Sequence, residues 1–184
     1  MRPFIVIYLL FLGIVALLAQ MILPVHFPIL SIIGFDSALI PLVVIYASLE
    51  LGDEWAIFVA GILGLLVDLS STSHRLGSSV LILCLLSTLI VSQAHKPESH
   101  QWLFRLTFVL VGTFTFLLLD YLFNLMETGR WVWPLSVWSK ITFASLLNLI
   151  LCPLFFYLAG LPLRLCGWKP SHETTDRYRD YPYA

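Results

Sequence analysis

The stretch PFIVIYLLFLGIVALLAQMILPV, residues 3–25, runs for 23 residues without a charge. A helix needs about 20 such residues to cross the hydrocarbon core of a bilayer. Arg2 stands before the stretch, as in a secretory signal peptide, but the apolar run is too long and contains no A-x-A cleavage site. We therefore predict a first membrane span that is not cleaved and that ends at Pro24 and Pro28.

Composition carries the same indication through the whole chain. Of the 184 residues, 59% are apolar and 11% are charged, whereas a soluble domain has about 45–50% apolar and about 25% charged residues. This balance excludes a disordered chain, a nucleic-acid-binding protein and an ordinary soluble enzyme. Seven of the charged residues fall in the last 21 positions. We therefore predict a membrane domain over residues 1–163 and an unstructured cytoplasmic polar tail over residues 164–184.

Five further charge-poor segments follow the first one. Two of them have only 13 residues each and are separated by an acidic turn, so a helix over either would cover roughly 20 Å of about 30 Å of hydrocarbon. They are predicted to be either short spans or a re-entrant hairpin. The fold class is therefore an all-α integral membrane protein with about six transmembrane helices, or four plus the hairpin. The segments are 37–49, 55–67, 76–94, 102–126 and 141–163.

Lysine and arginine are distributed unevenly between the two sets of loops. With the N-terminus inside, seven of them lie on the inner side and three on the outer side, which favours an N-in and C-in orientation. Trp131, Trp133 and Trp138 cluster before the last span, as in the aromatic belt of a membrane interface. The inner set is Arg2, Lys96, Arg105, Arg164, Lys169, Arg177 and Arg179, and the outer set is Arg75, Arg130 and Lys140.

Small residues form a pattern in the third segment. Ala56, Ala60, Gly64 and Asp68 recur every four residues, which places them on one face of a helix, with Gly61 beside them. Small residues at this spacing let two helix backbones approach closely. We predict that this face packs against a neighbour, with Asp68 at its outer end. The alternative is that Asp68 lies at the water interface and interacts with the serine-rich turn over residues 70–73.

A second polar group is predicted within the membrane. Asp120 lies six residues before Met126, roughly 9 Å along a helix, and Lys140 lies near the outer start of the last span. A lone charge in lipid is costly, whereas a hydrogen-bonded pair is less so. We predict that Asp120 and Lys140 pair, with Asn124 and Asn148 as further polar groups on adjacent helices.

The sequence gives no reason to predict an enzyme, a metal site or a cofactor. No two of the five histidines lie four residues apart, and Cys84, Cys152 and Cys166 show neither a C-x-x-C spacing nor a disulfide framework. Two facing aspartates such as Asp68 and Asp120 would form the dyad of an intramembrane aspartyl protease. The residues around them lack the signatures of those enzymes.

Residues 61–69, GILGLLVDL, followed by residues 70–77, SSTSHRLG, resemble the bacterial rod shape-determining protein family MreD. That family has glycines and an aspartate at the end of a central span, then a short polar turn, a glycine and another apolar span. Gly61, Gly64, Asp68 and Gly77 are the matching positions. The chain carries SSTSHR where many members have a glycine and a proline in the turn. The size and six-span hydropathy over residues 3–163 also look like this family.

The resemblance implies a non-catalytic scaffold in the bacterial inner membrane that maintains rod shape. Its implied partners are the single-span protein MreC, and behind it the actin-like filament MreB and the synthases that elongate peptidoglycan. Asp68 is then expected to shape or polarise a partner-facing surface at the outer boundary of the membrane.

A different class remains open on composition alone. Substrate-binding subunits of energy-coupling-factor vitamin transporters are similarly small, six-helical and poor in charge. In that reading a vitamin would bind near the outer face, in a pocket formed by three tryptophans and the polar groups of the last two spans. That pocket would consist of Trp131, Trp133, Trp138, Asp120, Asn124 and Lys140.

Overall fold

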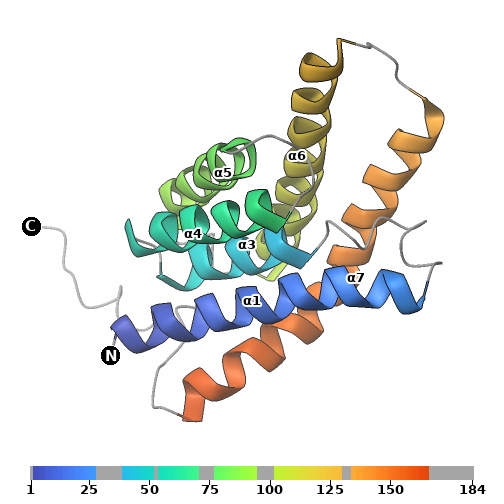
Figure 1. The fold of residues 1–184 in the computed structure, drawn as a ribbon. Coiled ribbons are helices and arrows are strands. Elements are labelled where there is room, and N and C mark those ends of the chain that lie inside the picture. The colour runs from blue at the N-terminus through green and yellow to red at the C-terminus, as the bar shows by residue number, and fades with distance from the viewer. Residues whose placement is uncertain are drawn as a thin grey trace, which may run out of the picture.

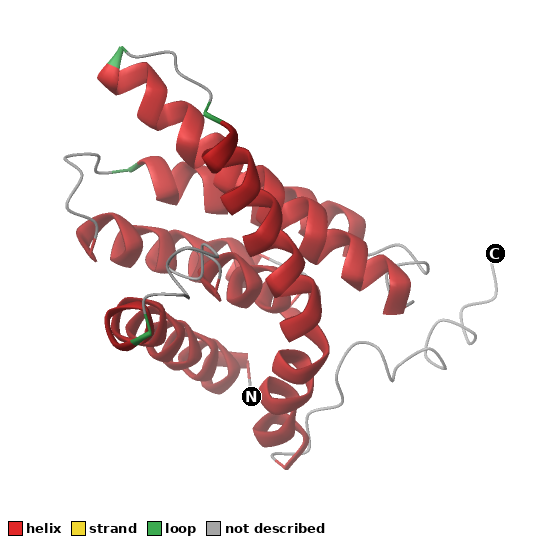
Figure 2. Cartoon of the chain, turned by 90° about the vertical axis from the view of Figure 1, so that its right-hand side faces the viewer, coloured by secondary structure: helices red, strands yellow, loops and turns green. Residues whose placement is uncertain are grey.

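A computed structural model describes residues 2–27, 39–51, 54–70, 77–94, 102–129 and 134–165. Over these ranges the chain is all-helical and has no strand, as the sequence predicted (Figure 2). The helices are α1 (Arg2–His26), α3 (Leu39–Leu51), α4 (Glu54–Ser70), α5 (Ser78–Ala94), α6 (Trp102–Thr128) and α7 (Leu135–Leu165).

Three of these helices are long and apolar enough to cross a membrane, namely Pro3–His26, Trp102–Met126 and Leu135–Leu165. The chain therefore has the character of a membrane protein. Leu39–Leu51 and Ser78–Gln93 are shorter apolar helices. The count of six spans and the N-in orientation stay predictions.

The last helix differs from its predicted range at both ends. It begins at Leu135, six residues before the predicted start at 141, and it ends at Leu165. The predicted span began after Lys140 because that residue is charged. The helix nevertheless includes Lys140, since an exposed lysine can carry its charge to water on a long aliphatic stem. Arg164, assigned to the tail, lies in the last turn of α7, where the helix dipole favours a cation. Residues 166–184 of the predicted tail lie outside the described residues.

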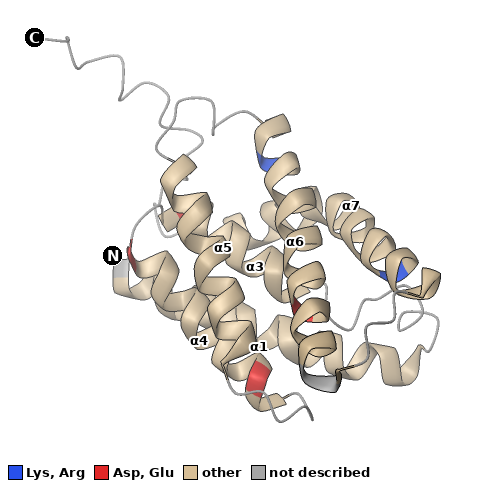
Figure 3. Ribbon diagram, turned by 90° about the horizontal axis from the view of Figure 1, so that it is seen from above, with Lys and Arg blue, Asp and Glu red and all other residues tan. Residues whose placement is uncertain are grey.

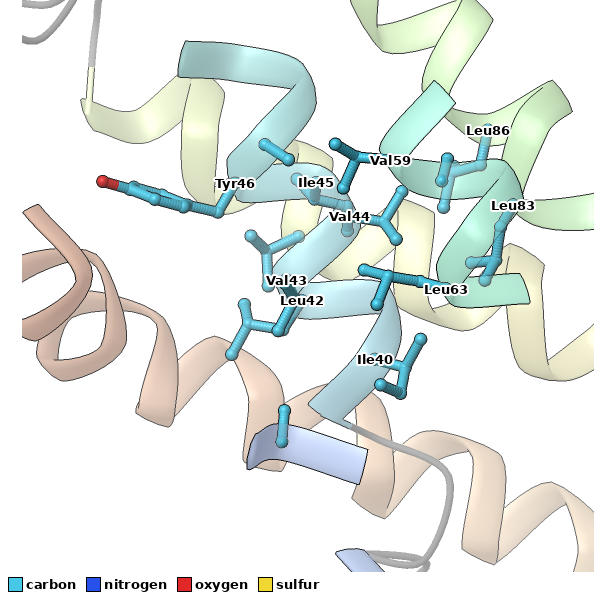
Figure 4. Close-up of a cluster of buried hydrophobic side chains, with 14 of the residues drawn as sticks. Ile40, Leu42, Val43, Val44, Ile45, Tyr46, Val59, Leu63, Leu83 and Leu86 are labelled. Atoms are coloured by element: carbon cyan, nitrogen blue, oxygen red, sulfur yellow. The ribbon is translucent and has the colours of Figure 1, made fainter. Parts of the chain in front are cut away.

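Helix α3 forms the centre of the bundle. Every residue from Ile40 to Glu50 is buried, and the helix contacts α1, α4, α5, α6 and α7 (Figure 1). A helix that is apolar on all sides is stable only when other helices cover it. Figure 4 shows aliphatic side chains of α3 packed against those of α4 and α5, such as Val59 and Leu83. Because protein surrounds α3, its 13 residues do not need the length of a lipid-facing span.

Hydrogen bonds of polar side chains join several pairs of helices at buried or partly buried points. The Ser48 and Ser87 hydroxyls lie 2.9 Å apart between α3 and α5, and Asn148 Nδ2 donates to Thr113 Oγ1 at 3.0 Å between α7 and α6. The Tyr8 hydroxyl donates to the main-chain oxygen of α7 residue 159 at 3.0 Å. Hydrogen bonds of this kind commonly hold transmembrane helices together.

The outer surface of the bundle is apolar. Charged residues are sparse along the helices (Figure 3). Large apolar side chains instead remain exposed on several helices, which suits a bilayer better than water because soluble monomers rarely expose extended apolar patches. Examples are Phe4 and Phe11 on α1, Leu81 and Leu85 on α5, and Leu154 and Leu158 on α7.

Candidate functional site

The side chain of Asp68 binds the start of α5. It is only 4% exposed at the end of α4. Its Oδ2 accepts a hydrogen bond from the Gly77 main-chain N–H at 2.7 Å, and its Oδ1 accepts one from Ser79 N–H at 3.1 Å. The first N–H groups of a helix have no partner within that helix, and they attract negative charge. Asp68 therefore caps α5 from the neighbouring helix.

Gly77 makes this arrangement possible. Its carbonyl accepts the hydrogen bond from Leu81 N–H at 3.0 Å, so Gly77 is the N-cap residue of α5. Glycine has no side chain to satisfy the free N–H groups, and Asp68 supplies the missing carboxylate. The φ angle of Gly77 is +107°, in a region that other L-residues rarely adopt.

Gly64 brings the backbones of α4 and α5 into contact. A Cβ atom at this position would lie 2.6 Å from Val80 Cα and 2.8 Å from Val80 N. Gly61 is less confined, because a Cβ there would lie 3.5 Å from Cys84 Sγ. Ala56 and Ala60 are fully buried on the same helix. We call Gly64, Asp68, Gly77 and Ser79 the α4–α5 joint.

The joint shows which packing the small-residue face makes. Gly64 and Asp68 contact α5 of the same chain, so this end of the face packs inside the molecule. The alternative partner of Asp68 was the turn over residues 70–73. Of that turn the structure describes Ser70, whose hydroxyl donates to the Val67 carbonyl at 2.8 Å.

Asp120 and Lys140 lie at a similar level of the α6–α7 pair. The Thr113–Asn148 hydrogen bond sets the antiparallel register, and counting seven residues from it along each helix leads to Asp120 and Ile141. Asp120 is half-buried, whereas Lys140, next to buried Ile141, is exposed. Their pairing stays a prediction. Trp131 and Trp133, offered for the alternative pocket, lie outside the described residues, and Asn124 and Trp138 are exposed.

A buried ion pair lies at the opposite end of α6. Arg105 Nη1 is 3.6 Å from Glu50 Oε1, and the two side chains are 5% and 1% exposed. Sequence reasoning counted Arg105 among the inner-side cations and did not pair it with Glu50, which begins the acidic turn after segment 37–49. The available signal was a lone arginine inside an apolar segment, because a charge there generally has a partner of opposite sign.

The ion pair forms part of the floor of a cavity of about 380 Å³. The cavity lies between the end of α3, the start of α6 and the second half of α7. Arg105 and Asp120 are separated by about 22 Å along α6, so this cavity is not the outer pocket expected for a transporter subunit. It is lined by Tyr46, Glu50, Trp102, Arg105, Pro153, Phe156, Tyr157, Gly160 and Arg164.

The described ranges contain no group of three or more histidine, cysteine, aspartate or glutamate side chains that could hold a metal ion. No known protein family, curated protein or solved structure matches this chain. Fold and site together define an all-helical protein of membrane character, with an interhelical cap at one place and a charged cavity at another.

Proposed function

We propose that the chain is a non-catalytic membrane scaffold of the bacterial cell-wall elongation machinery, similar to MreD. In this proposal it lies in the inner membrane with both termini inside and binds an MreC-like single-span protein. The MreB-like filament and the wall-elongation synthases associate through that partner. The observation that carries the proposal is the α4–α5 joint.

The joint uses the same residues that carry the resemblance. Gly64 allows the backbone contact, Asp68 supplies the cap, and Gly77 adopts the positive φ angle that begins α5. Three matching positions therefore have one common structural purpose, which is to hold two helices in a defined relation. Residues that fix the packing of two helices determine the fold and take no part in chemistry, which supports a scaffold better than a reaction centre.

The geometry also narrows the role of Asp68 in partner binding. Its two carboxylate oxygens accept hydrogen bonds from α5, and the side chain is almost fully buried. Asp68 therefore acts on a partner as a positioning residue, through the relation of α4 to α5. A direct contact between its carboxylate and the partner is not part of the proposal.

The test is affinity purification of the tagged full chain from mildly solubilised membranes, with quantitative mass spectrometry of the recovered proteins. We expect one MreC-like single-span protein in stoichiometric amount. Asp68→Ala should lower its recovery severalfold, whereas Glu54→Gln, at an exposed acid on the same helix, should not. Full recovery with Asp68→Ala would remove the positioning role.

The same experiment separates the two classes of function. Recovery of ATPase subunits together with a coupling membrane protein would overturn the scaffold proposal and favour the transporter subunit. In that case saturable binding of a vitamin by the purified chain would be the next measurement. Recovery of the chain alone would also count against the scaffold.

A further inference from the structure

The cavity between α3, α6 and α7 has a buried floor and an exposed rim. Tyr46, Glu50 and Arg105 are buried in its floor, and Gly160 leaves space beside them because it has no side chain. The rim includes Trp102, Tyr157 and Arg164, which are all exposed. Figure 4 shows the Tyr46 hydroxyl directed away from the aliphatic cluster of α3.

The charges of the cavity favour an anion. The lining contains two arginines and one glutamate, so the cavity carries one excess positive charge when all three groups are ionised. A guanidinium has five N–H donors in a planar arrangement that suits phosphate oxygens, and Arg105 can therefore hold Glu50 and an anion together. Tyrosine hydroxyls and the indole N–H of Trp102 add neutral donors. The volume falls within the range of small-molecule sites.

The surroundings of the rim favour an anion that carries an apolar tail. Leu103 follows Trp102 on α6. On α7, Leu161 lies three residues before Arg164 and Leu165 directly after it. All three leucines are exposed. Tryptophan at a helix end is typical of the membrane–water interface. In the proposed orientation this end of the bundle faces the cytoplasm, where basic pockets between helices bind lipid headgroups.

We propose that this cavity binds the phosphate of an anionic phospholipid headgroup, with Arg164 at the rim and Arg105 in the floor as its cationic contacts. The acyl chains lie along the exposed leucines beside the rim. The site is independent of any protein partner, and only its location on the cytoplasmic side rests on the orientation proposed above. A free phosphate ion offers the same headgroup chemistry without the apolar contact.

The test uses the purified full-length chain in detergent, with bound lipid counted by native mass spectrometry during titration with phosphatidylglycerol or phosphatidylcholine. We expect one saturable phosphatidylglycerol that phosphatidylcholine does not replace. Arg164→Gln should weaken this binding about fivefold, the contribution of one basic residue near an anionic surface. Lys140→Gln is the matched control, because it removes an exposed cation from the opposite end of the same helix.

A second variant blocks the space without changing the charge. A Cβ at residue 160 would lie 3.7 Å from the Tyr46 hydroxyl oxygen, an ordinary contact, so Gly160→Ala fits. Gly160→Leu projects further into the cavity and should abolish saturable binding, with Gly160→Ala intermediate. Circular dichroism and size-exclusion chromatography check that the variants fold. If Gly160→Leu fails to fold, Gly160→Ala and Arg164→Gln still decide the outcome.

Three results would overturn the proposal. Equal affinity for both lipids would mean that the headgroup charge is not recognised. Unchanged phosphatidylglycerol binding in Arg164→Gln and the two Gly160 variants would place the lipid elsewhere. Displacement of the lipid by millimolar inorganic phosphate or glycerol phosphate would identify a soluble anion as the ligand. Persistence of the lipid against both anions supports the lipid as the source of the phosphate.

Discussion

Asp68 caps a helix to which it does not belong, because it lies on α4, nine residues before the first residue of the α5 cap. An N-cap side chain normally belongs to the residue that begins the helix, but glycine occupies that position in α5. The carboxylate of Asp68 replaces it and accepts two main-chain hydrogen bonds. Hydrogen bonds to a charged group contribute more than neutral ones, and a buried N–H that loses its partner destabilises the fold.

We therefore expect Asp68→Ala to lower the free energy of unfolding by about 2–3 kcal/mol, because the buried Ser79 N–H and the partly buried Gly77 N–H both lose a charged acceptor. Asp68→Asn should lie between Ala and the wild type, since it keeps one of the two acceptor oxygens. Thermal melting in detergent, followed by tryptophan fluorescence, measures the change. Glu54→Gln on the same helix is the control, and equal melting of Asp68→Ala and this control would contradict the capping role.

The ion pair of Glu50 and Arg105 allows a second prediction at the residue scale. Removing one member leaves a buried charge without its counterion, which typically costs about 3–5 kcal/mol. Glu50→Gln and Arg105→Met should therefore each destabilise strongly, whereas the double variant should lose clearly less than the sum. A double-mutant cycle of melting measurements in detergent gives the coupling. The distant exposed residues Glu54 and Lys140 should be additive in the same cycle, and additivity of Glu50 and Arg105 would refute the pair.

Sequence reasoning reached these residues unequally, for a physical reason. The spacing of Gly64 and Asp68 on one helix face is a local property, so it was visible in the sequence. The groups that Asp68 binds are main-chain N–H groups, which every residue except proline possesses, so no pattern identifies them. Glu50 and Arg105 meet only because α3 and α6 are adjacent in the folded chain. The pairing of Asp120 and Lys140 was predicted from their similar depth and opposite charge, and it stays a prediction, because neither property determines which way a side chain faces.

At the scale of the helix pair, two glycines of α4 offer a direct comparison. A methyl group at Gly64 would overlap the α5 backbone, which cannot move aside as a side chain can. Gly64→Ala should therefore destabilise by about 1–3 kcal/mol, the usual cost of overpacking. Gly61→Ala meets only Cys84 Sγ at an ordinary distance, so it should be neutral or slightly stabilising through its helix propensity.

Melting temperatures of the two alanine variants in the same detergent test this contrast. Since both variants add one methyl group to the same helix, they differ only in what that group meets. Equal stability of the two would show that α4 and α5 do not touch at Gly64.

Helix α3 explains why the short segments were ambiguous in the sequence. An apolar run of 13 residues is consistent with a short span, a re-entrant arm or a buried core helix, because length was the only available criterion. In the structure, α3 has neighbours on all sides, namely α1, α4, α5, α6 and α7. Contacts of this kind join residues far apart in the chain, and hydropathy along a single segment does not contain them. The long helices α1 and α6 were predictable because each is long enough to be recognised alone.

At the scale of the whole molecule, the ion pair bears on how deeply α3 reaches. Arg105 is in the first turn of α6, a helix long enough to cross the membrane, so it lies near a membrane surface. Glu50 contacts it from the last turn of α3. Arg164, in the last turn of α7, lines the same cavity. The end of α3 is therefore level with two membrane-surface helix ends, which favours a full crossing over a re-entrant hairpin.

Cysteine labelling tests this topology in a variant whose native cysteines are replaced. Ser136 and Glu54 are exposed and lie at the starts of α7 and α4. With the N-terminus inside, Ser136→Cys should react with a membrane-impermeant maleimide in intact spheroplasts, because it faces outward. Glu54→Cys should react only after the membrane is opened, because the end of α3 and the start of α4 reach the inner surface.

Each other pattern of labelling has a distinct meaning. Reaction of Glu54→Cys in intact spheroplasts, with Ser136→Cys protected, would reverse the orientation and place the charged cavity at the outer face. Protection of Glu54→Cys under both conditions would make α3 and α4 a re-entrant hairpin with its turn inside the bilayer. That result would also leave the Glu50–Arg105 pair deep in the membrane, and the first turn of α6 would then have to begin below the lipid headgroups.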